Sequence, residues 1–84
     1  MDSVSNERLE AAKTIEDFIE GTGGIWDWDE FITATKFRDP LVLKIQAECL
    51  MTADRYPTSS GWCNDQGIEL MRGFIIELRH KASI

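Results

Sequence analysis

The 84-residue chain has few of the residues that usually carry catalysis or hold a metal. It contains one histidine, His80, and two cysteines, Cys49 and Cys63. Two cysteines are too few for a zinc site or a disulfide framework, so we expect two reduced thiols, with Cys49 buried on a helix. No GxSxG motif, HExxH motif or phosphate-cradling lysine loop is present. The sequence therefore predicts a protein that is not an enzyme and that needs no metal or cofactor.

Long apolar runs and the pattern of a secretory leader are also missing. No segment approaches the ~18 uncharged apolar residues that mark a membrane-spanning helix. The stretch MDSVSNERLEAAK has no basic start followed by an apolar block, which is the pattern of a signal peptide. We therefore expect a cytoplasmic protein that makes no membrane contact.

Positive charge is scarce, and it is unevenly distributed along the chain. Nine Lys and Arg residues face fifteen Asp and Glu residues, which gives a net charge of −6. Residues 1–35 hold nine acidic and two basic residues, a net charge of −7, whereas residues 36–84 have a net charge of +1. Negative charge repels nucleic-acid phosphates, so we expect no nucleic-acid binding. The acidic half suits a basic protein partner, or it serves solubility.

Apolar residues recur with helical spacing in four segments, and no segment alternates with the period of a strand. The expected helices cover about residues 6–20, 27–34, 40–55 and 65–81 of one domain that spans 1–84. This pattern predicts a compact all-α domain of four helices. The segment 40–55 is apolar on two sides, which predicts a central helix or else one uncovered partner face. The short helix 27–34 is expected to pack crosswise.

Residues that start or stop helices support these boundaries. Gly21 follows the first helical segment, where a left-handed C-cap residue belongs. Asp39 and Pro40 form an N-cap and first-turn pair, which is a strong signal for the start of the helix 40–55. Candidate N-caps for the first and last helices are Ser3 or Ser5, and Asn64 or Asp65.

The stretch GTGGIWDWDEF, residues 21–31, is the most distinctive in the chain. Its acidic residues do not fit a calcium loop, because Phe31 stands at a ligand position. A helix start accounts for all of it: Asp27 as N-cap, and Glu30 reaching back to the Asp27 N–H in a capping box. Trp26 and Phe31 then form the apolar staple that accompanies such a cap. The stretch is therefore predicted to be structural.

Two other regions are candidate contact surfaces. Trp62 lies in the polar loop PTSSGWCNDQG, close in sequence to Tyr56, and is either a lid over the core or an exposed contact residue. On the expected last helix, Gly73 and Ile76 lie away from the apolar stripe. They indicate either a tolerated glycine beside one exposed isoleucine, or a close helix contact within the fold or across a dimer. The candidate contact residues are Trp62, Tyr56, Gly73, Ile76, Glu69 and His80.

Two resemblances follow from these residues. GTGGIWDWDEF, followed by DP and a helix, resembles small uncharacterised bacterial proteins with a WDWDDF-type motif, over residues 18–45. That resemblance implies a bacterial source and no particular activity. The RYP loop and the acidic four-helix plan are similar to colicin immunity proteins in size, charge and helix number. Those proteins carry a tyrosine pair at the corresponding turn, where this chain has only Tyr56.

Three functional hypotheses result. The first is a non-enzymatic protein-interaction module, such as an inhibitor or an immunity-like binder of a basic partner. The second is a homodimeric structural or regulatory protein, joined through Gly73, Ile76 and the second apolar stripe of the helix 40–55. The third is a small enzyme that uses Cys63 and His80.

Overall fold

The computed structural model describes residues 3–24, 27–59 and 61–82. These residues form four helices and no strand, which confirms the all-α prediction. The first helix begins before the expected Asn6, so Ser5 lies inside it and does not cap it. The helix expected at 40–55 has the predicted bounds. The helices are α1 (Ser3–Glu20), α2 (Asp27–Thr33), α3 (Pro40–Arg55) and α4 (Asp65–Ala82).

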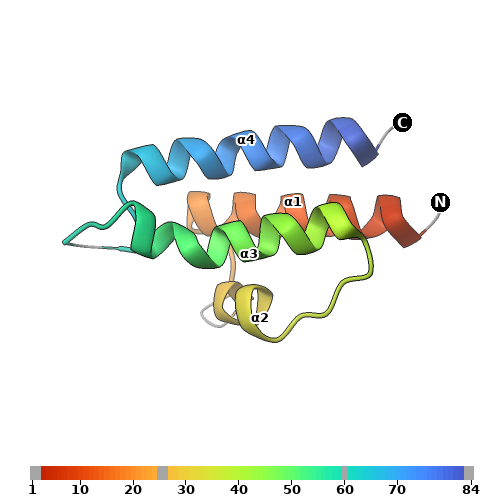
Figure 1. The fold of residues 1–84 in the computed structure, drawn as a ribbon, viewed down its shortest axis with the longest axis horizontal. Coiled ribbons are helices and arrows are strands. Elements are labelled where there is room, and N and C mark those ends of the chain that lie inside the picture. Colours follow the sequence, from red (N-terminus) through yellow and green to blue (C-terminus); the bar gives the residue numbers. More distant parts are fainter. Residues whose placement is uncertain (1–2, 25–26, 60, 83–84) are drawn as a thin grey trace.

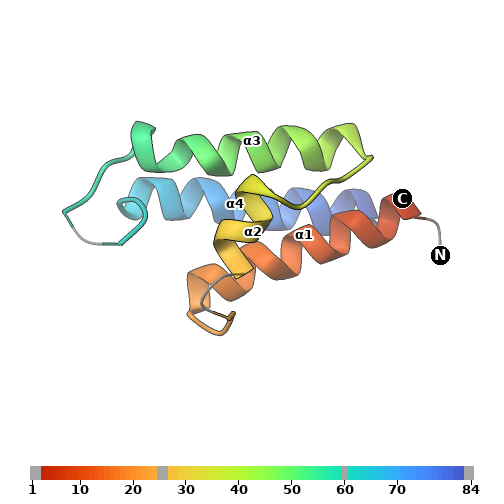
Figure 2. The ribbon, with the colours of Figure 1, turned by 90° about the horizontal axis from the view of Figure 1, so that it is seen from below.

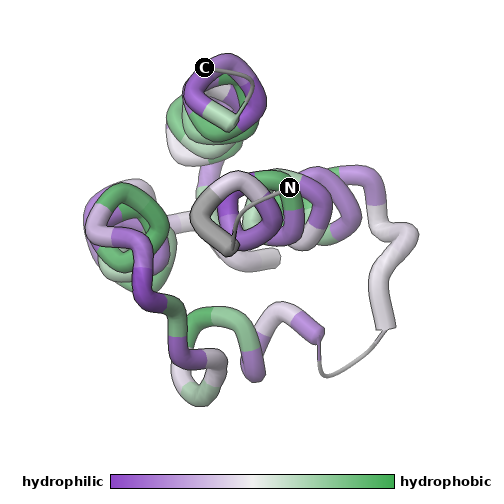
Figure 3. The backbone as a smooth tube through the Cα atoms, turned by 90° about the vertical axis from the view of Figure 1, so that its right-hand side faces the viewer, coloured by the Kyte–Doolittle hydropathy of each residue, from purple (hydrophilic) through white to green (hydrophobic). Residues whose placement is uncertain are grey.

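Three long helices run along the molecule, and the short helix lies across them. α4 runs antiparallel to α1, so the start of α1 and the end of α4 lie at the same end of the molecule (Figure 1). Seen from below, α2 crosses the direction of the other helices, as expected for the segment 27–34 (Figure 2). Seen from the end, α1 lies between α4 and α2, with α3 beside it (Figure 3).

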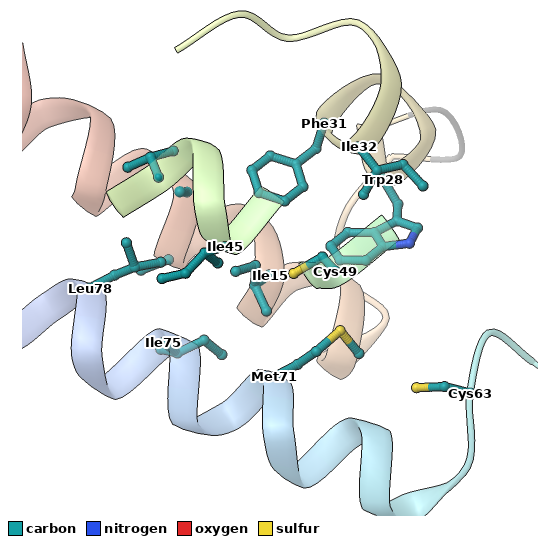
Figure 4. Close-up of a cluster of buried hydrophobic side chains, with 13 residues drawn as sticks. Ile15, Trp28, Phe31, Ile32, Ile45, Cys49, Cys63, Met71, Ile75 and Leu78 are labelled. Atoms are coloured by element: carbon teal, nitrogen blue, oxygen red, sulfur yellow. The ribbon is translucent and has the colours of Figure 1, made fainter. Parts of the chain in front are cut away.

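The core lies where these helices meet, and all four contribute to it (Figure 4). The apolar stripe predicted on α4 is confirmed, since Met71, Ile75 and Leu78 are buried. Each apolar side chain that is fully buried contributes about 1.5–3 kcal/mol to folding. The largest fully buried residues are Ile15, Ile45, Met71, Leu78, Val42, Thr52 and Cys49.

The predicted signal at the end of α1 is confirmed in detail. Gly21 has a φ of 72°, in the left-handed region that glycine adopts without strain. The N–H of Thr22 donates to the Asp17 carbonyl (2.9 Å), and the N–H of Gly21 donates to the Phe18 carbonyl (3.3 Å). These two bonds form a Schellman motif, which ends α1 and reverses the chain toward α2.

A polar junction joins α1 to the start of α3. The Asp39 carboxylate accepts the N–H of Leu41 at 3.1 Å, so the predicted N-cap is confirmed. The same carboxylate, only 2% exposed, accepts two bonds from the Arg8 guanidinium, and this pairing holds the pKa of Asp39 below its usual value. Glu7 accepts the N–H groups of Arg38 and Asp39. We call Glu7, Arg8 and Asp39 the polar junction.

One apolar face of α3 is covered and the other is open. Its inner residues Val42, Ile45 and Cys49 are buried, but its second apolar stripe is open to solvent. A helical pattern shows that two faces are apolar, but it cannot show that both are covered. Of the two alternatives for this segment, the structure therefore supports an uncovered apolar face. The exposed stripe includes Leu43 (42%), Leu50 (46%) and Met51 (43%).

The glycine at a close helix contact is Gly67, not Gly73. A Cβ atom on Gly67 would lie 2.7 Å from Cys63 Sγ and 2.8 Å from Thr52 Cγ2, so only glycine fits there. A Cβ on Gly73 would meet nothing within 4 Å among the described residues. The predicted close contact at Gly73 within the fold is therefore wrong. Ile76 beside it is 71% exposed.

Candidate binding groove

A groove of about 670 Å³ lies between α1, α2 and the loop that precedes α4. This volume is in the usual range for ligand sites in proteins. Most of the stretch GTGGIWDWDEF lines it, so the segment predicted to be only structural also forms a surface. The lining residues include Glu10, Thr14, Asp17 and Phe18 of α1, Trp28 to Phe31 of α2, and Gly61 and Trp62 of the loop.

Aromatic rings form the floor of the groove. Trp28 stacks on Phe18 with a centroid distance of 4.1 Å, and Trp62 meets both rings edge-on at 5.9 and 6.3 Å. Phe31 continues the cluster toward Phe37 at 5.8 Å. Such offset and edge-on pairs each add ~0.5–1.5 kcal/mol beyond their buried area. The rings therefore give the groove an apolar floor.

The sequence predicts Trp62 and Tyr56 as candidate contact residues, but neither side chain is fully exposed. Both are half-buried and pack against the core cluster. Of the two interpretations of Trp62, the structure supports the lid over the core. The loop has no helical or strand period, so the sequence could not place this ring. Only the groove-facing part of Trp62 is open to a ligand.

Two indole N–H groups in this cluster have no acceptor. The Nε1 atoms of Trp28 and Trp62 are buried and make no hydrogen bond within the described residues. A buried donor without an acceptor costs about 1–3 kcal/mol. Trp28 is 6% exposed, and its indole nitrogen lies on the side of the ring away from Cys49 (Figure 4).

The rim of the groove is acidic. Its lining includes five carboxylates and, among the described residues, no lysine or arginine. One of the five, Asp17, is already engaged, because it accepts bonds from Lys13 (2.8 Å) and Thr22 (2.9 Å). These two hydrogen bonds lower the pKa of Asp17. The five acidic residues are Glu10, Asp17, Asp27, Asp29 and Glu30.

The predicted capping box at the start of α2 is wrong in its partners. The Asp27 carboxylate accepts the N–H of Gly24 (2.8 Å), and the Asp27 N–H donates to the Gly24 carbonyl (3.3 Å). The glycine run lets the chain turn back so tightly that Asp27 pairs with the loop, and Glu30 finds no bond there. Trp26 of the predicted staple lies outside the described residues. Its predicted partner, Phe31, is in the core.

Three rim carboxylates are left without a partner. Glu10, Asp29 and Glu30 make no side-chain hydrogen bond or ion pair with any residue that the structure describes. Of the nine described acidic residues outside the groove lining, five form an ion pair with a basic side chain of the same molecule. The observed pairs are Glu16–Arg79, Glu20–Arg72, Asp39–Arg8, Glu48–Arg55 and Glu77–Lys81.

The position of α2 depends on a residue that the sequence did not single out. The Gln46 side-chain amide, on α3, donates to the carbonyls of Phe31 (2.5 Å) and Thr35 (2.7 Å). These bonds satisfy carbonyl groups at the end of a helix, which have no partner inside it. Gln46 therefore fixes the end of α2 on α3. A single glutamine in an apolar helix gives no signal of this role.

The other predicted contact residues do not join the groove. Glu69, Gly73, Ile76 and His80 are exposed on α4, outside the groove lining.

The proposed cysteine and histidine pair is not assembled. Cys63 precedes the first turn of α4 and His80 lies in its last turn, so ~22 Å of helix separates them. Both cysteines are free. Burial raises the pKa of Cys63, and it raises that of Cys49 to about 12, with Glu48 and Cys63 adding to the effect at Cys49. The structure therefore does not bring together the Cys63 and His80 pair on which the third hypothesis relied.

Comparisons with protein-family models, with curated proteins and with solved structures find no match for this chain. Within the described residues, no group of three or more histidine, cysteine or acidic side chains is placed to hold a metal ion. None of the described helices is both long enough and apolar enough to cross a membrane. The groove and its chemistry are therefore the basis on which a function is inferred.

Proposed function

We propose that this chain is a non-enzymatic protein-interaction module that binds a basic partner through its acidic groove. The observation that supports this proposal most directly is a set of three carboxylates on the rim of the groove, around its aromatic floor. These carboxylates, which have no partner among the described residues, belong to Glu10, Asp29 and Glu30. Outside the groove lining, five of the nine described acidic residues are paired with a basic side chain of the same molecule. Charge that is left unpaired around an apolar groove complements a cationic surface.

The physical basis of this binding is electrostatic attraction over an apolar contact. Exposed carboxylates attract basic residues over several ångströms, which speeds association and makes it sensitive to salt. Aromatic side chains supply contact area with little entropy cost, and tryptophan is enriched at the residues that dominate binding energy. The groove places the carboxylates and the aromatic rings on one surface. This favours an inhibitor or immunity-like binder over a protein whose acidic residues serve only solubility.

Capture of the partner from a lysate of the source organism tests the proposal. The bait is the wild-type chain, and the groove variant is Glu10→Gln with Glu30→Gln. The matched control is Asp54→Asn with Glu69→Gln, which removes the same charge from exposed residues outside the groove. We expect the wild type and the control to capture one stoichiometric partner at low salt, and the groove variant to lose it.

Two results would contradict this proposal. One is a clean wild-type preparation at low salt, without a partner. The other is a partner that the groove variant retains as well as the control does. The proposal also requires that raised salt elutes the partner, because interactions between exposed charges are screened beyond ~10 Å at 0.1 M salt.

A homodimer is the second candidate, favoured by the exposed apolar residues of α3 and α4. Leu43, Leu50 and Met51 form a stripe on α3, and Ile76 is exposed on α4. Sedimentation of the wild type, Ile76→Glu and Leu50→Glu tests it. A dimer that either substitution dissociates supports this candidate. A wild type that is monomeric at high concentration excludes it.

A further inference from the structure

The length of the groove limits what it holds. Its α1 wall is formed by residues three or four positions apart, from Glu10 through Thr14 and Phe18 to Gly21. Eleven residue steps of helix rise span ~16 Å. An extended chain advances about 3.3 Å per residue, so about five residues fit along this wall. The groove is thus longer than one cationic side chain needs, and it matches a short peptide segment.

The distribution of charge and apolar surface across the groove then selects the sequence of that segment. Carboxylates without partners come from both flanking helices, with Glu10 on α1 and Asp29 and Glu30 on α2. The rings of Phe18, Trp28 and Trp62 lie in the same groove. An apolar side chain is the favourable contact for these rings, and cations are the favourable contact for both flanks.

We infer that the groove recognises an extended segment of about five residues in which one apolar residue has lysine or arginine on each side. This inference rests on the proposed function, and it names the part of the basic partner that binds. The apolar residue seats on the aromatic floor. The flanking cations pair with Glu10 on one side and with Asp29 and Glu30 on the other.

The buried indole donors provide a second observation that points to a peptide. Trp28 and Trp62 are two of the residues that line this groove, and their buried indole N–H groups have no acceptor among the described residues. Trp28 is more than nine-tenths buried. An extended peptide carries a carbonyl oxygen at every residue, which is the type of acceptor that these donors lack. A compact inorganic or metal cation offers no such group.

Selection from a displayed library of random decapeptides tests the inference, with the wild-type chain as the bait. The expected consensus is an apolar position flanked on both sides by lysine or arginine. A synthetic peptide, Lys-Arg-Leu-Arg-Lys, and its serine form, Lys-Arg-Ser-Arg-Lys, then measure the central residue. We expect the serine form to bind at least tenfold more weakly, and the groove variant to bind the leucine form at least tenfold more weakly than the control does.

The outcomes separate this inference from the proposed function. Selected peptides that are basic but share no apolar position, or equal affinity for the two synthetic peptides, overturn the inference and leave the basic-partner proposal standing. Failure to select basic peptides at all overturns both. Basic peptides that the groove variant binds as well as the wild type does also overturn both, because binding then lies elsewhere on the molecule.

Discussion

The polar junction and the groove rim both contain acidic residues, but these residues differ in burial and in pairing. At the junction, Asp39 is 2% exposed, and its carboxylate is paired with Arg8 and with the first turn of α3. At the rim, the Glu10 and Glu30 carboxylates are exposed and have no partner among the described residues. The difference shows that the availability of an internal cation, more than the residue type, decides whether an acid stabilises the fold or remains open to a ligand.

The largest expected effect is at the junction. Arg8→Ala leaves the buried Asp39 carboxylate without its cation, and breaking a buried pair in this way costs about 3 kcal/mol. Urea unfolding measures this loss. The control is Arg72→Ala, whose partner Glu20 is exposed and whose loss costs no more than about 1 kcal/mol. Equal losses for the two variants would contradict the contrast between a buried and an exposed carboxylate.

A second pair of substitutions contrasts a covered helix face with an open one. Gly67→Ala forces a Cβ atom to within 2.7 Å of Cys63 Sγ, so we expect a cost of about 1–3 kcal/mol from overpacking. Gly73→Ala meets open space in a helix interior and should stabilise the protein by up to about 1 kcal/mol. Thermal unfolding of both variants is the measurement. A destabilised Gly73→Ala monomer would show that this face is covered after all.

The pH dependence of stability tests the role of Asp39 in the polar junction. The Arg8 guanidinium holds the pKa of Asp39 below its usual value, so the unfolded chain takes up a proton at this residue before the folded chain does. The stabilisation is therefore complete above the usual aspartate pKa of about 3.9 and is lost as the pH falls below it. Between pH 5 and pH 2, Asp39→Asn should lose less unfolding free energy than the wild type. Parallel curves would contradict this assignment.

The smallest stability effect is expected at the rim. Glu10→Gln and Glu30→Gln remove no internal ion pair, so each should change the unfolding free energy by no more than about 0.5 kcal/mol. Urea unfolding under the conditions used for Arg8→Ala provides the direct comparison. A large loss of stability at either residue would mean that the rim carboxylates stabilise the fold.

The local signals in the sequence predicted the local structure well. Gly21 as a left-handed cap, Asp39 with Pro40 at the start of α3, and Asn64 as the cap of α4 are confirmed. Each of these depends on residues within one turn of one another, so the pattern carries the information. The all-α fold and the core stripe of α4 follow from helical periodicity in the same way.

Features that join distant residues could not be read from the sequence. Arg8 and Asp39 are 31 positions apart, and Gln46 reaches back to Phe31 across a loop. The predicted capping box at the start of α2 is wrong for a related reason. The glycine run offers the Asp27 carboxylate a loop amide, the N–H of Gly24, which competes with the N–H groups of the helix. The groove likewise brings together residues that are far apart in the sequence. The sequence therefore shows its lining residues but not that they meet in one groove.

The central claim is that the rim carboxylates bind a basic partner. It is tested most directly by the dissociation constant of fluorescein-labelled Lys-Arg-Leu-Arg-Lys, measured at one ionic strength for three chains. We predict that the variant with Glu10→Gln and Glu30→Gln binds at least tenfold more weakly than the wild type, while the variant with Asp54→Asn and Glu69→Gln stays within twofold. Equal weakening in both variants, or unchanged affinity in the first, would contradict the claim.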